Sequence, residues 1–452
     1  MSVGSIRDRE AVIALSRFGL GARPEDLRIA RSDPRGYVLS QLEGPPLEPI
    51  AGIASAAQGH VLRSRYQRRD KLEARGEGTA KEHRNRMRRS ALEDRKAWLV
   101  HTVGARDGYG ERLAMFWSNH LAVSRSVRVV DPLRGAYEND VVRPHALGRF
   151  RDMVEASSAH PAMLLYLQQA QSFGPNSRAG RKRGRGYNEN YARELLELHT
   201  LGVDGGYAQS DVTTLALLLT GWGVDSPVRR PERAGRGVFF RARHEPGEHA
   251  VLGRIYDGPP RRLRSKVVAD LARHPSTARF VSAKLAAAFV GPNPPEPLVQ
   301  DLERTFRDTE GDLREMARTL AGSDLAWEAP ADAFTPPRDW LIALARAMPG
   351  GARPGALLRR MKAMGHELWA PPSPAGFKPQ GPWWLGPQAM EARVEAAGSV
   401  AARTRGIDDA SRHAVALFGS ALSPRSARTI AQAESVRQGL TLLAMTPEFL
   451  RR

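Results

Sequence analysis

Apolar residues recur at the helical spacing along almost the whole chain, and this periodicity constrains the fold more than any other feature. In ERLAMFWSNHLAVS, for example, Leu113, Phe116 and His120 follow at i, i+3 and i+7, which places them on one face of a helix. A single stretch, GVFFRARHEPGEHAVLGRIYDG, alternates as strands do, and it predicts two short strands around EPGE, between Val238 and Tyr256. The predicted fold class is therefore mainly α: a large multi-helical globular domain with one small β-hairpin insertion.

The helical patterns continue from end to end of the 452 residues, and no segment repeats at a fixed period. We therefore expect a single domain over residues 1–452, with a substantial core. Its expected subregions are N-terminal helices at 1–54, a charged helical hairpin at 55–102, a helical core at 103–225, a loop and β-hairpin at 226–262, and C-terminal helices at 263–452 that contain a Pro- and Trp-rich loop at 369–390.

The chain is strongly basic, with a formal net charge of +19 and a pI near 10.8. Such a balance attracts polyanions, including nucleic acid, anionic lipid and acidic proteins. Arginine is spread along the whole sequence, however, and the 55–102 hairpin mixes Arg with Glu. Two interpretations of the hairpin stay open: a basic arm for nucleic acid, and a solvated pair of helices whose Arg stems cover apolar surface. We expect the second, with only non-specific binding to nucleic acid.

Cysteine is absent, which excludes disulfides and thiolate metal sites and leaves His, Asp and Glu as the strong metal ligands. No apolar run reaches about eighteen residues, so no membrane span is expected. The first residues, MSVGSIRDREAVIALSRFGLG, lack the basic start, apolar centre and small-residue cleavage site of an export signal. As written, the chain is expected in the cytoplasm; the alternative is export together with a signal-bearing partner.

Eight segments, taken in order, carry a resemblance to a known family. They are FWSNHLAVS, RPHALGRFRDMV, HPAMLLYL, NENYARELLELHTLGVDGGY, DVTTLALLLTGW, RHEPGEHAVLG, HPSTARFVSAKLAAAFV and PPSPAGF. Together they resemble the bacterial family named domain of unknown function 1800 across nearly the whole chain. The resemblance implies no established activity. It implies a partner, because members often resemble exported proteins encoded beside a second uncharacterised family with an alkaline-phosphatase-like fold, and an acidic protein of that kind is the expected partner.

The segment YNENYARELLELHTLGVDGGY crowds Glu, Asn, Arg and His into about three helical turns. Glu189, Arg193 and Glu197 fall at i, i+4 and i+8, the spacing of a surface salt-bridge ladder. Glu194 is outside that ladder, and a second buried carboxylate would need a cation, a basic partner or a raised pKa. We therefore expect Glu194 and Glu197 to face inward beside a basic group of another helix. His199 falls on an apolar stripe and is expected to be a core histidine on a separate side.

The expected partners are Arg143, His145 and His120, which with Glu194 and Glu197 form the candidate catalytic set. Carboxylate and imidazole groups suit a divalent metal, for which Glu194, Glu197, His120 and His145 are the candidate ligands. Their spacing lacks the paired short intervals of a typical metal motif, so a structural buried network is the competing interpretation. Further candidate ligand-binding residues are Asn119, Asn188, Asn190, Arg193, Asp211 and His244.

The common phosphate-loop, HExxH and GxSxG motifs do not occur in the sequence. The sequence therefore predicts an uncharacterised helical accessory or interaction protein with a buried Glu/Arg/His network and a basic surface. The alternative is a metal- or anion-binding enzyme, with hydrolysis as one candidate reaction, that uses the candidate catalytic set.

Overall fold

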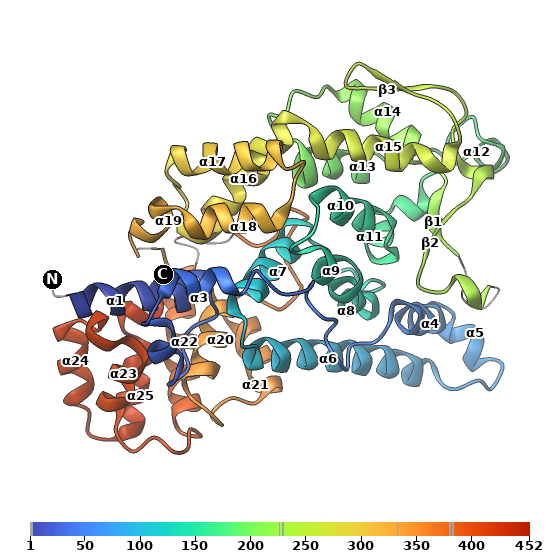
Figure 1. Cartoon of the computed structure of the whole chain (residues 1–452). Coiled ribbons are helices and arrows are strands. Elements are labelled where there is room, and N and C mark those ends of the chain that lie inside the picture. Colours follow the sequence, from blue (N-terminus) through green and yellow to red (C-terminus); the bar gives the residue numbers. More distant parts are fainter. Residues whose placement is uncertain (1–2, 226, 228–229, 332, 379–380, 382–383) are drawn as a thin grey trace.

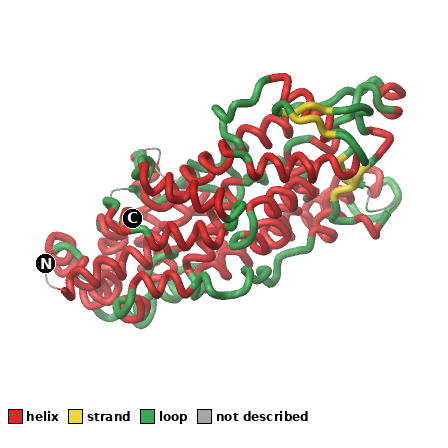
Figure 2. Tube along the Cα trace, turned by 45° about the horizontal axis from the view of Figure 1, so that its top comes forward, coloured by secondary structure: helices red, strands yellow, loops and turns green. Residues whose placement is uncertain are grey.

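Helices form where the 3.6-residue apolar period coincides with a capping residue or a proline in the first turn. Thr79 shows the first case: its hydroxyl accepts from the Glu82 N–H, and the Glu82 carboxylate accepts from the Thr79 N–H. The computed structural model describes residues 3–225, 227, 230–331, 333–378, 381 and 384–452. They form an elongated, mostly helical molecule with its strands at one end (Figure 1, Figure 2). The predicted mainly α fold is confirmed.

The N-terminal helices lie against the C-terminal ones, as the blue and red ribbons in Figure 1 show. Asp8 fixes this contact because its carboxylate accepts from both the N–H and the hydroxyl of Ser420. The elements of this part are α1 (Val3–Ile13), a π-helical turn (Ala14–Phe18), α2 (Asp26–Ala30) and α3 (Pro34–Ser40).

The charged segment, predicted to form a helical hairpin, contains three helices, of which the first two both contact the third. Met87, Ala91 and Trp98 bury one face of the longest helix, while Arg84 and Arg88 on other faces are exposed. The elements are α4 (Ala56–Gln67), α5 (Arg69–Glu73) and α6 (Ala80–Gly104).

The central part consists of shorter helices, several of which contain π-helical turns. The elements are α7 (Gly108–His120), a 3-10 turn (Asp131–Leu133), α8 (Arg134–Tyr137), a π turn (Glu138–Val142), α9 (Arg143–His145), α10 (Phe150–Ala159), α11 (Pro161–Tyr166), a 3-10 turn (Gln169–Gln171), α12 (Arg178–Arg183), α13 (Asn190–Glu194), a π turn (Leu195–Thr200) and α14 (Gln209–Leu219).

The strands pair differently from the predicted hairpin around EPGE. β2 (Gly237–Phe239) pairs antiparallel with β1 (Trp222–Val224), and β3 (His249–Val251) pairs with β4 (Arg254–Tyr256). The chain between β2 and β3 is held against the end of α14, since His244 Nδ1 lies 3.0 Å from the Thr220 carbonyl oxygen. The true hairpin turn is Leu252-Gly253, where both residues have positive φ, as two-residue hairpin turns of the primed types require. Short 3-10 turns lie at Pro231–Arg233 and Arg241–Arg243.

The C-terminal part is helical again, and the predicted Pro- and Trp-rich loop at 369–390 lies partly outside the described residues. The elements are α15 (Pro260–Arg273), α16 (Pro275–Val290), α17 (Glu296–Asp308), α18 (Leu313–Gly322), α19 (Asp324–Glu328), α20 (Pro337–Ala347), α21 (Pro354–Ala363), α22 (Pro387–Ala401), α23 (Ala410–Phe418), a 3-10 turn (Gly419–Ala421), α24 (Pro424–Ala431), α25 (Val436–Ala444) and α26 (Pro447–Leu450).

Buried apolar side chains gather in two large clusters. The first core contains Phe150 and Phe289, and the second contains Trp340 and Leu443. Helix α7 lies at the seam between them, because its residues contribute to both cores. Within the described part of the chain, no helix combines the length and apolar character that a bilayer crossing needs.

Candidate functional site

The candidate catalytic set does not come together. Arg143 pairs with Glu111 rather than with Glu194 or Glu197: its Nη1 and Nη2 groups donate to the two carboxylate oxygens at 2.9 and 2.8 Å. His101 Nε2 lies 2.9 Å from the same carboxylate. Burial alone would raise the pKa of Glu111, but the hydrogen bonds from His101 and Arg143 overcome it and lower the pKa to about 2. A buried Glu/Arg/His network thus exists, with a different acid and a different imidazole from those predicted.

Glu194 and Glu197 lie on a half-buried side of their helix, so the prediction that they face inward beside a basic group of another helix is wrong. Burial and the charge of Glu197 raise the pKa of Glu194, against the opposing effect of Arg193. The hydroxyl of Tyr207 lies 3.4 Å from the Glu197 carboxylate. Other side chains occupy the inward positions. They are Tyr191 and Ala192 of α13, and Leu195, Leu196 and His199 of the π-helical turn that continues it.

The two histidines of the candidate set lie apart. His145 Nδ1 is 2.8 Å from the Val141 carbonyl oxygen of its own segment, whereas His120 is buried at the end of α7. His120 Nε2 lies 3.1 Å from the carbonyl oxygen of His199, so His199 is buried as predicted but adjoins His120 instead of occupying a separate side. The described residues hold no group of three or more His, Asp or Glu side chains placed to bind a metal, and the four metal candidates do not converge.

Three of the other ligand-binding candidates shape the start of α13. The Asn188 side-chain oxygen accepts from the Asn190 N–H at 2.8 Å, a local turn just before the helix. Arg193 and Glu189 form the first step of the predicted ladder at 3.2 Å. These groups therefore have local partners.

Asp211 and His244 hold neighbouring backbone. The Asp211 carboxylate accepts from the N–H of Ala208 at the start of α14 and from the N–H of Leu252 in the hairpin turn. His244 holds the Thr220 carbonyl, as described for the strands. Both residues thus connect α14 to the β-strand region.

We expect Glu194→Gln to change the free energy of unfolding by no more than about 0.5 kcal/mol at pH 7. Glu194 makes no ion pair in the described part of the chain, and the substitution removes its repulsion with Glu197. Urea unfolding measures the change. A loss of about 3 kcal/mol or more would instead show that Glu194 belongs to a buried ion network.

Asn119 and His120 line a cleft at the seam of the two cores, which we call the His120 cleft. It encloses about 580 Å³, a size typical of small-molecule sites. Its walls come from the end of α7, from α16, from residues 365–378 and from Trp384. Three of the segments that carried the family resemblance, FWSNHLAVS, HPSTARFVSAKLAAAFV and PPSPAGF, therefore meet here.

Lys284 of α16 is the most unusual charged group in the His120 cleft. Its Nζ lies 5.0 Å from the centre of the Phe280 ring, and it forms no ion pair with a carboxylate in the described part of the chain. Burial lowers the pKa of Lys284 to about 8 and, together with the Lys284 charge, lowers that of His120 well below its usual value. The imidazole is consequently neutral at pH 7 while the amine is mostly charged.

The loop wall of the cleft is attached to α7 through Asn119. Its Nδ2 donates to the Phe377 carbonyl oxygen and its Oδ1 accepts from the Phe377 N–H, each at 2.8 Å. The preceding Gly376 has φ of +84°, and a Cβ there would lie 2.5 Å from the backbone oxygen of Asn119. This position therefore requires glycine for both its conformation and its space. Asn119, predicted to bind a ligand, lines the cleft and also positions the wall that a ligand would meet.

Gly376→Ala is expected to lower the free energy of unfolding by at least about 1 kcal/mol, because Ala strains the backbone and separates the loop from α7. Urea unfolding monitored by tryptophan fluorescence would detect it, since Trp384 lies in the same loop. Gly322→Ala, in a helix and with no atom within 4 Å of the added Cβ, is the matched control and should cost nothing. Equal stability of the two variants would contradict the predicted strain.

Aromatic rings cover the loop side of the cleft. The His366 ring centre lies 4.1 Å from that of Phe377 and stacks on Trp384 at 5.0 Å. Burial lowers the pKa of His366 to about 3, so this imidazole is also neutral at pH 7. The wall offers flat apolar faces to a bound molecule.

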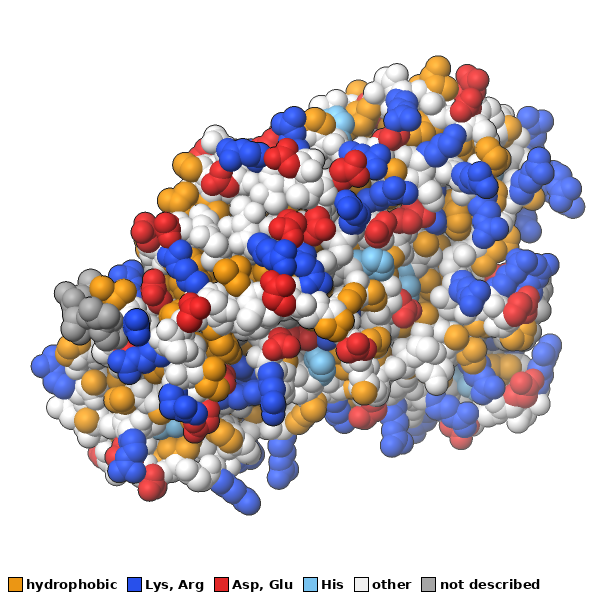
Figure 3. Space-filling view, viewed as in Figure 1, with side chains coloured by type: hydrophobic (Ala, Val, Ile, Leu, Met, Phe, Trp, Pro, Cys, Tyr) orange, Lys and Arg blue, Asp and Glu red, His pale blue; other side chains and the backbone are white. Residues whose placement is uncertain are grey.

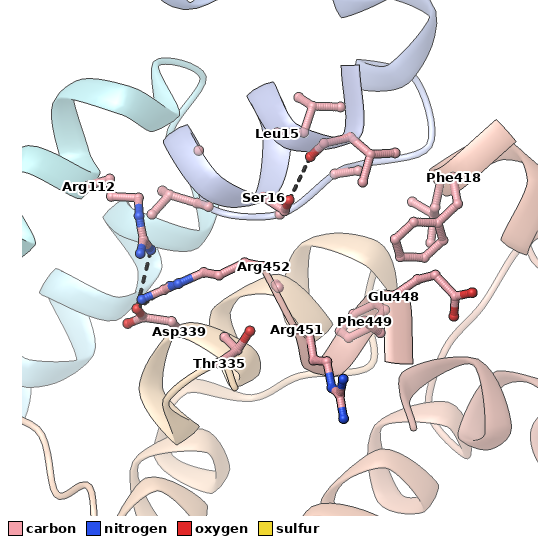
Figure 4. Close-up of a pocket in the computed structure, with 17 residues that line it drawn as sticks. Leu15, Ser16, Arg112, Thr335, Asp339, Phe418, Glu448, Phe449, Arg451 and Arg452 are labelled. Atoms are coloured by element: carbon pink, nitrogen blue, oxygen red, sulfur yellow. Dashed lines mark hydrogen bonds and ion pairs between the residues drawn. The ribbon is translucent and has the colours of Figure 1, made fainter. Parts of the chain in front are cut away.

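A buried cluster of charge, the Asp339 cluster, lies beside the cleft. Arg112 and Arg452 donate to Asp339 Oδ2 at 3.2 and 2.7 Å, and Arg338 Nε donates to Oδ1 at 2.8 Å. Guanidinium side chains therefore outnumber carboxylate side chains in this cluster. Figure 4 shows Arg112 and Arg452 reaching Asp339 from different segments, beside a pocket of only about 50 Å³, which has room for water alone.

The cluster and the cleft share a lining. The small pocket beside Arg338 and Asp339 includes Phe116, Asn119 and Phe377, which also line the His120 cleft. Positive charge thus lies next to the apolar cleft.

The sequence did not identify Lys284, Glu111 or Asp339 as site residues. Lys284 is a single charge inside an otherwise apolar helical pattern, FVSAKLAAAFV, whereas Glu111 and Asp339 each adjoin an arginine, Arg112 and Arg338. The pattern around Lys284 is a signal that could have found it, because an isolated charge on an inward face needs a partner or a function.

In a comparison with protein families, the model described as "Protein of unknown function (DUF1800)" matches residues 13–451. The comparisons with curated proteins and with solved structures return no match.

Proposed function

The chain belongs to the DUF1800 family over almost its whole length, and we propose that its His120 cleft binds a small anionic molecule with an apolar portion. The description of the family names no activity, so the cleft itself is the best guide to function. The observation that carries this proposal is Lys284, a half-buried amine in an apolar cleft that has no carboxylate partner in the described residues. An anionic ligand would supply the missing counter-charge.

The surroundings of Lys284 suit both the anionic group and the apolar portion of the proposed ligand. The Asp339 cluster beside the cleft adds positive potential, and low-dielectric walls strengthen electrostatic attraction. The rings of Phe116, Phe377 and Trp384 provide apolar contact area. This proposal retains the anion-binding part of the sequence-based alternative, but moves it from Glu194 and Glu197 to another part of the fold.

Calorimetric titration with benzoate, and with benzyl alcohol as the neutral analogue, tests the proposal. We expect benzoate to bind and benzyl alcohol to bind at least about tenfold more weakly. Lys284→Met should abolish this preference, whereas Lys362→Met, which removes an exposed lysine on α21, should leave it unchanged. Equal binding of the two probes, or an unaffected Lys284→Met variant, would refute an anion site in the cleft.

A second function, docking of an acidic protein, is favoured by one feature near α12. Arg183, Arg185 and Arg243 place their guanidinium groups 5.8, 5.6 and 4.9 Å from the centre of the Phe173 ring. Neither Arg183 nor Arg185 has an ion pair within the described ranges, and basic side chains gather at this end of the molecule (Figure 3). By the family resemblance, the partner would be an alkaline-phosphatase-like protein.

Binding to poly-glutamate at rising salt tests this second function. Replacing Arg178, Arg181 and Lys182 of α12 with Gln is expected to weaken binding about tenfold, because surface charges steer and hold an acidic partner. The same charge change at Arg84, Arg86 and Arg89 of α6 should have a smaller effect. If both triple variants bind equally, only net charge matters; DNA serves as the competitor that reports non-specific attraction.

A further inference from the structure

Lys284 combines three properties in one place: a primary amine, apolar surroundings and access to the His120 cleft. Helix α16 buries Val281, Leu285 and Phe289 in the first core, and Lys284 leaves the same helix toward the cleft. No carboxylate among the described residues holds the amine in its charged form. We propose that Lys284 forms an imine with a carbonyl group of the anionic cleft ligand, an inference that rests on the proposed function.

The amine is partly available as a nucleophile near neutral pH. With a pKa of about 8, about a tenth of Lys284 is uncharged at pH 7, whereas an ordinary lysine is uncharged in roughly three molecules per ten thousand. Desolvation in an apolar pocket is one of the ways in which proteins activate lysine for Schiff-base chemistry.

His120 supplies a neutral base beside the amine. Its Nε2 faces the His199 carbonyl at 3.1 Å, and because a carbonyl only accepts, Nε2 carries the ring hydrogen. Nδ1 therefore holds a lone pair, and it has no hydrogen-bond partner in the described residues. The titratable groups near Lys284 are thus the neutral imidazoles of His120 and His199 and the amine of Lys378, which also lines the cleft; no Asp or Glu among the described residues lines it.

The proposed step is balanced without any redox change. The Lys284 nitrogen lone pair forms a bond to the carbonyl carbon, and the C=O π electrons move to oxygen. A proton passes from nitrogen to that oxygen by way of His120 Nδ1, which gives a carbinolamine. The carbinolamine then loses its hydroxyl group and the second nitrogen proton as one water molecule, and the C=N bond forms. The substrate class is an aldehyde or ketone that also bears a carboxylate or phosphate.

The chain has only eight lysines, so covalent labelling can be assigned to each of them. Full-length protein is incubated at pH 8 with 4-formylbenzoate and sodium cyanoborohydride, which reduces an imine to a stable amine. We expect one equivalent of label on Lys284, formed at least tenfold faster than on any other lysine and suppressed by benzoate. Benzaldehyde, the neutral analogue, should label Lys284 more slowly.

Two variants separate the chemistry from the binding. Lys284→Arg keeps the positive charge and should bind benzoate but carry no label in the cleft. His120→Gln keeps a donor for the His199 carbonyl and lacks Nδ1, so labelling of Lys284 should slow about tenfold even at a saturating concentration of 4-formylbenzoate.

The possible failures are distinguishable. Labelling spread over exposed lysines, or concentrated on Lys378, would overturn the imine while benzoate binding could still support the anion site. Selective labelling of Lys284 that benzoate fails to suppress would keep the imine and overturn the anion site. Absence of both benzoate binding and selective labelling would overturn the two together.

Discussion

Asp339→Asn is expected to reduce the free energy of unfolding by about 3–5 kcal/mol, a larger effect than any other single substitution proposed for this protein. The variant keeps the shape of the side chain but leaves the guanidinium groups of Arg112, Arg338 and Arg452 without the carboxylate that they share. Arg112 and Arg452 are each only 5% exposed, so water cannot replace the lost partner fully. Urea unfolding at pH 7 provides the measurement.

Asp301→Asn is the matched control, because Asp301 also pairs with an arginine, at 3.2 Å, but both side chains of that pair are exposed. Asp301→Asn should lower the free energy of unfolding by less than about 1 kcal/mol. If Asp339→Asn proves as mild as the control, the cluster is hydrated in solution. Such a result would also weaken the case for strong positive potential beside the cleft.

The second large effect is expected at Glu111. Glu111→Gln should cost about 3 kcal/mol or more at pH 7, since it strands the buried Arg143 guanidinium that the carboxylate binds through both oxygens. Because the pKa of Glu111 falls from 4.5 to about 2 on folding, its stabilisation is complete above pH 4.5 and disappears as the pH falls toward 2. The stability gap between the natural protein and the variant should therefore narrow over that range.

Unfolding curves collected between pH 2 and pH 7 would show this narrowing. Glu93→Gln serves as the control, because Glu93 pairs with Lys96 on the exposed side of α6 and its removal should produce a small, nearly pH-independent change. A constant gap between Glu111→Gln and the natural protein would mean that packing, and not the charge of Glu111, is responsible for the loss.

The fold was largely predictable because helical periodicity survives in almost every segment. The prediction that two strands pair around EPGE was wrong for a physical reason. β1 is only three residues long, too short to leave an alternating pattern in the sequence, and yet it pairs with β2. The π-helical turn at Leu195–Thr200 likewise cannot be recognised from the sequence, because its apolar residues still follow the three- and four-residue spacing of an α-helix.

The candidate site was predictable only in part. Asn119 and His120 were identified, and both line the cleft, because polar residues beside large apolar ones on a helical stripe stand out in the sequence. Which segments face them could not be deduced, since Lys284 and Phe377 are more than 150 residues away along the chain and only the packing of the two cores brings them together. The dense charge around Glu194 was more conspicuous in the sequence than the cleft residues. In the structure, these charged side chains lie on a half-buried helix face.

Because Asn119 holds Phe377 by its backbone, the attachment of the cleft wall does not depend on the side chains that the wall presents to the cleft. Both hydrogen bonds reach backbone atoms, so they form with any side chain at that position. Neighbours such as Ser373 and Ala375, which line the cleft, can be exchanged without loosening the loop. The same scaffold can therefore be diversified, by natural variation or in a designed library, to accept different molecules while Asn119 and Gly376 stay fixed.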